Sequence, residues 1–189
     1  ITRRHIRVKV MQLLYSKKFN TQNFKKNDED WLYESYNNFY NLYLFLLSLF
    51  IEIKLKTENH LKINEKKYMP SNNNVYKKFS NNRIFDIIES HIKLLNFNYS
   101  NIKLDWNNYA DYLSVIWNDI FKDKICINYA NQSENNLIND KKFILKIYKK
   151  NIVCNLKLQE LVEDISITGT DDFPLVNSII TNNINNLFI

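Results

Sequence analysis

The stretch YNLYLFLLSLFIEI, residues 40–53, decides the fold of this chain, because it carries more apolar side chains than one face of a helix can use. A surface helix needs only one apolar stripe, so a segment that is apolar around most of its circumference belongs inside the protein. Upstream, the acidic turn Asp28–Asp30 favours a helix start, since carboxylates stabilise the positive end of the helix dipole. We therefore predict a central helix from Asp28 to about Lys67, either continuous or divided by a kink.

The same stretch is too short and too interrupted to cross a membrane. Its longest apolar run, Leu42–Ile53, contains Ser48 and Glu52 and falls below the roughly 20 residues that a spanning helix needs. The N-terminal segment is led by arginines and has no cleavage site, which is unlike a secretory signal. Cys126 and Cys154 lack the spacing of a paired motif. These features predict a cytoplasmic protein with no membrane partner.

Glycine is nearly absent from the sequence, and this excludes several classes of enzyme and fold. Gly169 is the only glycine among 189 residues, and there are two prolines. Phosphate-cradling loops and dinucleotide or methyl-donor sites need several glycines at fixed spacing. Tight hairpin turns also depend on glycine, so a sheet protein is disfavoured. We therefore predict an all-α fold. The chain is also long enough to bury a core without disulfides.

Helical periodicity recurs along the rest of the chain and predicts a bundle of about six or seven helices. Residues 71–82 are polar and read as a connection, which suggests a possible subdivision into 1–70 and 83–189. In the last helix Asp171 or Asp172 is the expected cap, and Pro174 is expected near the first turn. Besides the central helix, the predicted helices are Thr2–Lys18, Arg83–Leu95, Trp106 to about Tyr129, one beginning at Asp140, Leu156–Ile165 and one after Asp171.

The first predicted helix is unusual because arginines occupy its opening turns. Arg3, Arg4 and Arg7 lie where the helix dipole disfavours cations, at a cost of roughly 0.3–1 kcal/mol each. A phosphate reverses that penalty, because free backbone amides, the dipole and the planar guanidinium groups all attract it. The net charge of +6 is compatible with such a partner. Nucleic acid is therefore the first ligand to consider.

The spacing of the first helix also predicts which face is buried. Ile6, Val10, Leu13 and Leu14 recur at helical spacing, and Met11 and Tyr15 widen the apolar arc. These residues are expected to anchor the helix to the bundle. The remaining polar stripe is expected to stay open to solvent or ligand, and it consists of His5, Lys9, Gln12 and Ser16.

The pattern Arg-Arg-x-x-Arg-x-x-x-x-Gln-x-Leu-Tyr-Ser, residues 3–16, resembles the opening helix of the transcription antitermination factor NusB family. The longer segment TRRHIRVKVMQ, residues 2–12, is similar to the extended form of this family found in Bacteroidetes. Four later segments follow in the order that the extended form shows, so the resemblance covers nearly the whole chain: YNLYLFLLSL (40–49), NNRI (81–84), DKKFILKIYKK (140–150) and DDFPLVNS (171–178).

The resemblance implies a NusB-like helical RNA-binding protein over residues 1–189 that acts without a cofactor. The family recognises the boxA element of nascent ribosomal RNA leaders together with NusE, a ribosomal protein, and the complex acts on RNA polymerase against termination. By position, Arg3, Arg4 and Arg7 would contact phosphates. From its position beside the arginines, His5 is expected to be a surface donor or a weak phosphate contact, and Lys9, on the open stripe, is a further candidate for RNA binding. Gln12 and Tyr15 would either reach RNA or support the helix.

One departure from the family affects this interpretation. The family carries a hydrophobic helix and a Phe-Val-Asn-Gly-type segment near its C-terminus, which in the extended form would lie beyond Ile189. The chain also starts at Ile1 and ends in an apolar segment without a capping glycine. We therefore expect a NusB-like region that is incomplete at the C-terminus, with part of its RNA and NusE surface missing.

Several alternatives stay open at the level of sequence. The arginines are either a phosphate site or a solvated basic end, and the aromatic residues of the central helix are either core or a stacking platform. The lysines between 141 and 150 either prolong an RNA track or form the wet face of a helix. No residues show the spacing of a metal site or a nucleophile–base pair, which predicts a non-enzyme. The chain could instead be an RNA-binding module of an RNA-modifying enzyme, or a degraded scaffold that binds only protein.

Overall fold

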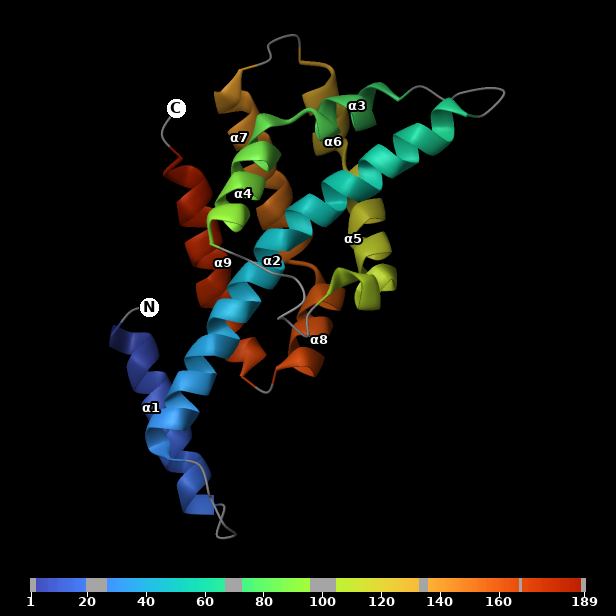
Figure 1. Ribbon diagram of the computed structural model, residues 1–189. Coiled ribbons are helices and arrows are strands. Elements are labelled where there is room, and N and C mark those ends of the chain that lie inside the picture. The colour runs from blue at the N-terminus through green and yellow to red at the C-terminus, as the bar shows by residue number, and fades with distance from the viewer. Residues whose placement is uncertain are drawn as a thin grey trace. The chain divides into compact units, whose positions relative to one another are not determined.

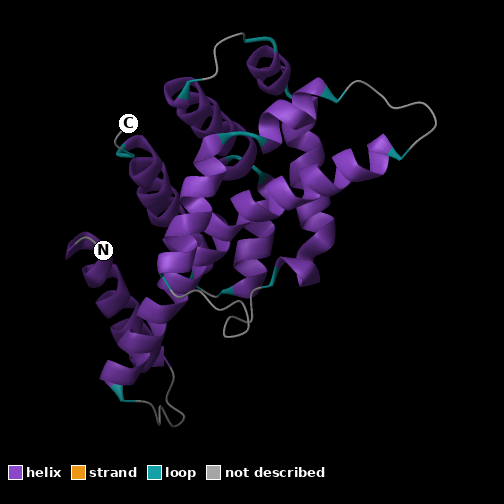
Figure 2. Cartoon of the chain, turned by 45° about the horizontal axis from the view of Figure 1, so that its top comes forward, coloured by secondary structure: helices purple, strands orange, loops and turns teal. Residues whose placement is uncertain are grey.

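The computed structural model describes residues 3–19, 27–66, 73–95, 105–132, 136–166 and 168–187. Within these ranges every regular element is helical and no strand occurs (Figure 2). The predicted all-α fold is therefore confirmed. The elements in chain order (Figure 1) are α1 (Arg3–Phe19), α2 (Asp28–Glu65), α3 (Asn74–Ser80), α4 (Arg83–Leu94), η2 (Trp106–Tyr109), α5 (Ala110–Lys122), α6 (Lys124–Ala130), α7 (Leu137–Ile147), η3 (Tyr148–Val153), α8 (Leu156–Ile165) and α9 (Gly169–Asn185).

The long periodic segments were predicted well, whereas shorter elements differ. Residues 74–80 form helix α3 and not a connection. The predicted helix from Trp106 to Tyr129 is divided at Asp123, whose extended backbone ends α5 and whose side chain accepts a hydrogen bond from the Ile125 amide to start α6. Helix α7 begins at Leu137, three residues earlier than expected, because the Asn136 side chain caps it. The expected cap at Thr2 lies outside the described residues.

The start of α9 also differs from the prediction. Thr168 occupies the N-cap position, while Asp171 and Asp172 lie inside the first turn, where carboxylates interact favourably with the helix dipole. The buried Asp172 accepts a hydrogen bond from the Thr168 hydroxyl at 3.1 Å. Since the helix begins at Gly169, Pro174 lies in its second turn, where it removes one intrahelical hydrogen bond.

The chain divides into two compact units, residues 1–41 and 42–189. This boundary falls inside α2, between Asn41 and Leu42, and not in the polar segment 71–82. The first unit consists of α1 and the beginning of α2. The second unit contains the remainder of α2 and all later helices.

The core of the second unit forms around the apolar part of α2. Every residue from Leu42 to Ile51 is buried, so the predicted core helix is confirmed. The indole ring of Trp106 stacks on Phe45, with the ring centroids 4.1 Å apart and the planes 5° from parallel. The indole N–H donates to the Phe45 carbonyl oxygen at 3.2 Å and to the Ser48 hydroxyl at 3.1 Å. Ser48 therefore interrupts the apolar run because it pairs with a buried donor.

The length and composition of α2 would also allow it to cross a membrane, and no other described helix meets that test. Yet 67% of its most apolar window is buried inside the protein. A partly buried hydrogen bond, from the Trp117 indole N–H to the Thr57 hydroxyl at 2.9 Å, connects the later part of α2 to α5. Its apolar surface is thus largely covered by the chain itself.

Gly169 lies where α9 approaches α8 too closely for a side chain. A Cβ atom placed there would lie 2.5 Å from the Val162 carbonyl oxygen and 2.9 Å from the Val162 Cγ1 atom. The backbone atom cannot move aside without shifting α8. The only glycine in the sequence therefore fixes the spacing of these two helices.

We expect Gly169→Ala to lower the free energy of unfolding by about 1–3 kcal/mol, the range typical of an overpacked core position. The measurement is chemical denaturation followed by circular dichroism. Thr170→Ala is the control, because Thr170 is the next residue of α9 and is exposed. Equal stability of the two variants would contradict this account of Gly169.

Candidate nucleic-acid interface

Helix α1 and the beginning of α2 form an antiparallel hairpin within the first unit (Figure 1). Near one end the His5 ring contacts Phe39, with ring centroids 4.9 Å apart. At the other end Lys17 forms an ion pair with Asp28. The first turns of α1, which carry the arginines, are thus anchored beside residue 39 of α2.

The buried face of α1 is the one that the sequence predicted to be open. His5, Lys9 and Leu13 follow one another at every fourth position and are buried, with 9%, 6% and 4% of their surface exposed. On α2, Ser35 and Phe39 are buried at the same spacing. Gln12 and Ser16 are half-buried, and the Ser16 hydroxyl donates to the Leu13 carbonyl oxygen at 2.8 Å. The prediction that the polar stripe stays open to ligand was wrong.

The predicted apolar anchor is exposed, apart from Leu13. Ile6 and Leu14 expose 53% and 58% of their surface, and Val10 is also exposed. The physical reason is that the hairpin buries only one narrow strip of α1. An imidazole ring and the methylene stem of a lysine supply enough apolar surface to fill that strip. The prediction for Ile6, Val10 and Leu14 was therefore wrong, and His5 and Lys9 act as packing residues.

The three arginines lie on the surface of α1. Arg3, Arg4 and Arg7 are exposed, and in the described part of the chain no carboxylate pairs with them. Arg3, Arg7, Val10 and Leu14 follow at the spacing of a single helix face, opposite the buried seam. Helix α1 also has no acidic residue in its first turn. The guanidinium groups are therefore available to an anion without first breaking an ion pair.

A pair of exposed aromatic rings lies at the other end of α1. Tyr15 and Phe19 expose 67% and 61% of their surface, and their ring centroids are 4.4 Å apart. The Lys18 ammonium group lies 5.7 Å from the centre of the Phe19 ring. Planar exposed rings beside cations are the usual means by which proteins hold single-stranded nucleic acid.

The sequence-based prediction included Tyr15 but missed Phe19 and Lys18. A signal was available, because Tyr15 and Phe19 are four residues apart on one helix, where aromatic side chains become neighbours. Arg3, Arg4, Arg7 and Tyr15 all lie on the exposed surface of α1. His5 and Lys9 lie instead on the opposite, buried side of α1, which packs against α2. Gln12 is half-buried and lies between these two sides.

Two side chains of the second unit that could carry chemistry, His60 and Cys126, lie in packed surroundings. Within the described ranges no group of three or more His, Cys, Asp or Glu side chains is placed to hold a metal ion. The His60 ring packs against Tyr76 and Trp117. Burial raises the pKa of the Cys126 thiol to about 12, so it stays protonated and is a poor nucleophile.

Comparisons with protein-family models, with curated proteins and with solved structures find no match to this chain. Any assignment of function therefore depends on the geometry of the site and on the resemblance of the sequence segments.

Because Lys9 packs in the seam and Arg7 does not, the two residues should respond differently to truncation. We expect Lys9→Ala to weaken the hairpin by roughly 1 kcal/mol, a typical cost for a buried contact, and so to speed amide hydrogen exchange along α1. Arg7→Ala removes the same charge from the same helix and should leave exchange unchanged. A similar effect of both variants would rule out the packing role of Lys9.

Proposed function

We propose that this protein is a NusB-like, non-enzymatic transcription antitermination factor that binds single-stranded RNA through α1. Its target would be the boxA element of a ribosomal RNA leader, bound in the cytoplasm together with NusE. The complex would act on RNA polymerase. The observation that carries the proposal is the presence on one helix of three exposed arginines without carboxylate partners among the described residues and an exposed aromatic pair.

The arginines suit the phosphate backbone of RNA. Each guanidinium group can donate two parallel hydrogen bonds to phosphate oxygens. Arg3 and Arg4 lie in the first turn of α1, where unpaired backbone amides and the dipole add to the attraction. Neutralising phosphates releases counterions, so the affinity should fall steeply as salt rises.

The aromatic pair suits the bases. Single-stranded RNA exposes base faces that stack on planar side chains, and this interaction is insensitive to salt because no ion is released. Tyr15 and Phe19 already lie against each other, which reduces the conformational entropy cost of binding. The two ends of α1 thus contribute different terms to binding, electrostatic attraction near Arg3 and stacking near Phe19.

The exposed aliphatic residues of α1 favour a second candidate, a scaffold that binds protein only. Ile6, Met11 and Leu14 are more than half exposed on the surface that carries the arginines. Contiguous apolar side chains on a surface often mark a protein interface. Under this alternative, RNA affinity would be negligible and would not depend on the arginines.

We expect Arg3→Ala combined with Arg7→Ala to weaken binding of a boxA-like RNA at every salt concentration. The slope of log affinity against log salt should flatten by roughly 0.7 for each phosphate of the single strand that the variant no longer neutralises. Fluorescence anisotropy titrations with and without NusE measure both effects. Lys62→Ala combined with Lys66→Ala is the control, since these exposed lysines lie at the far end of α2 and just beyond it. A double arginine variant that binds like its parent would refute the role of α1.

Tyr15→Ala and Phe19→Ala should each weaken binding by about 1–3 kcal/mol, the usual contribution of a stacked base, while the salt slope stays unchanged. Phe19→Tyr keeps the ring and should bind like the parent. The same anisotropy titrations test this expectation. A change in slope, or no change in affinity, would show that these rings do not stack on bases.

A further inference from the structure

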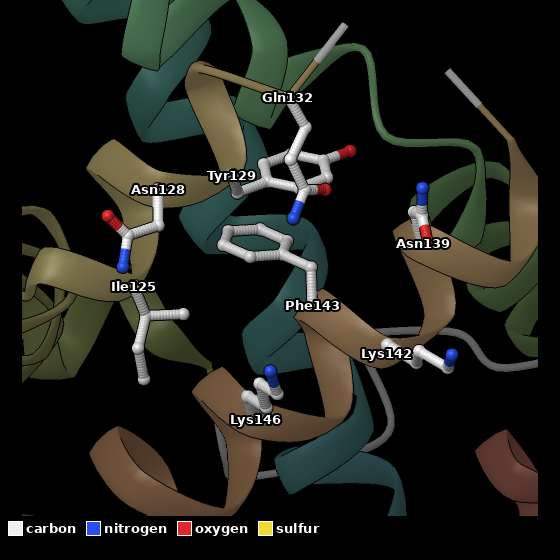
Figure 3. A pocket seen from close by; sticks show the side chains of 8 residues that line it. All are labelled: Ile125, Asn128, Tyr129, Gln132, Asn139, Lys142, Phe143 and Lys146. Atoms are coloured by element: carbon white, nitrogen blue, oxygen red, sulfur yellow. The ribbon is translucent and has the colours of Figure 1, made fainter. Parts of the chain in front are cut away.

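A pocket in the second unit lies between α6 and α7, away from any residue assigned above. Figure 3 shows its lining, with Phe143 of α7 at the centre and the Tyr129 ring beside it. The two rings are stacked, with centroids 3.9 Å apart and planes 9° from parallel. Both side chains are buried, so they form a fixed floor.

Hydrogen bonds hold this floor in place. The Tyr129 hydroxyl donates to the Asp140 carboxylate at 2.6 Å, and the Asn82 amide donates to the Tyr129 hydroxyl oxygen at 3.2 Å. Asn82 also donates to the Asp140 backbone carbonyl at 3.2 Å. Among the described residues, Asp140 is the only carboxylate near the pocket floor. It accepts the hydrogen bond from Tyr129, and only 5% of its surface is exposed. The pocket therefore presents little negative charge.

The rim of the pocket is cationic. Lys142 and Lys146 are four residues apart on α7, line the pocket and are exposed. In the part of the chain that the structure describes, neither forms an ion pair. Two neighbouring lysines differ, because Lys141 donates to the Leu187 carbonyl oxygen at 3.0 Å and Lys150 forms an ion pair with Asp123 at 2.7 Å. Lys141 and Lys150 thus already have a polar or charged partner, whereas Lys142 and Lys146 have no carboxylate partner among the described residues.

A second pocket lies on the other side of Tyr129 and adds to the positive charge. Lys77, Lys78 and Arg83 line it, and Lys77 also forms an ion pair with Glu65 at 3.9 Å. Lys78 connects the two pockets, because its ammonium group donates to the Gln132 carbonyl oxygen and lies 5.2 Å from the centre of the Tyr129 ring. Among the described residues, five basic side chains therefore line the two pockets, against one carboxylate, that of Asp140.

The size of the α6–α7 pocket limits what it can hold. Its volume is about 130 Å³, whereas sites for drug-sized molecules occupy roughly 300–1,000 Å³. A group of a few heavy atoms fits, and the two ammonium groups select an anion. Asn128, Gln132 and Asn139 supply neutral amides, which can donate to phosphate oxygens and can both donate to and accept from a ribose hydroxyl.

We propose that the α6–α7 pocket binds a phosphodiester group of RNA, with Lys142 and Lys146 as its cationic contacts. This inference rests on the proposed function, since it takes RNA to be the ligand. It adds a phosphate contact in the second unit to those of α1. The neutral amides would then contact the remaining phosphate oxygen or the adjacent ribose.

The test compares Lys142→Ala combined with Lys146→Ala in the full chain with the control Lys62→Ala combined with Lys66→Ala. The residues of both pairs are exposed and four positions apart, and both variants remove the same charge. We expect the pocket variant to bind a boxA-like RNA roughly three- to tenfold more weakly, as for two exposed charge contacts, and with a flatter salt slope. The control should bind like the parent. Titrating inorganic phosphate into the parent should shift the side-chain amide signals of Asn128 and Asn139 in NMR spectra.

The outcomes separate this inference from the proposed function. If the arginine variant loses affinity while the pocket variant behaves like the control, the pocket assignment fails and the function of α1 stands. A loss confined to the pocket variant would support the pocket and refute the role of α1. A parent chain with no RNA affinity overturns both, and phosphate shifts in that case would indicate a site for a free anion without RNA.

Discussion

Helix α2 must contribute to both compact units of the chain, and the rest of the structure depends on that constraint. Its N-terminal part packs against α1, where Ser35 and Phe39 are buried and Phe39 contacts the His5 ring. Its middle, residues 42–53, forms the centre of the second unit, where Phe45 stacks on Trp106. Residues 42–51 are all buried within the second unit, so this part of α2 has no solvent-facing side on which to carry a polar stripe. The density of apolar residues in this segment follows directly from its position.

The elements with strong periodicity could be predicted from the sequence, and the weaker ones could not. Residues 28–65 and 156–165 form helices close to the predicted bounds because apolar spacing and end signals agree there. Helix α3 was missed because its seven residues, NVYKKFS, are too few to show a period. The orientation of α1 was predicted wrongly for a different reason. Its apolar residues cover so much of the circumference that spacing alone cannot say which strip a single partner helix will bury.

The residues of the candidate site show the same difference between features that depend on one residue and features that depend on a packing partner. Exposure of Arg3, Arg4 and Arg7 was predictable, since a guanidinium group without a carboxylate partner is costly to bury. The burial of Lys9 was not, because it depends on the hairpin partner and not on α1 alone. The pocket between α6 and α7 could not be predicted either, since the stacking of Tyr129 on Phe143 arises only from the packing of these two helices.

The ion pairs suggest a general criterion for recognising binding surfaces on this basic protein. A lysine that already interacts with a carboxylate must exchange that partner to bind a phosphate, so the net gain is small. Lys17, Lys54 and Lys150 belong to this class. Arg3, Arg7, Lys142 and Lys146 have no carboxylate partner among the described residues, and two of them lie beside exposed aliphatic side chains of α1 and two beside a pocket. Net charge is therefore a poor guide to the ligand. The positions of basic side chains without a carboxylate partner indicate better where a polyanion would gain the most binding free energy.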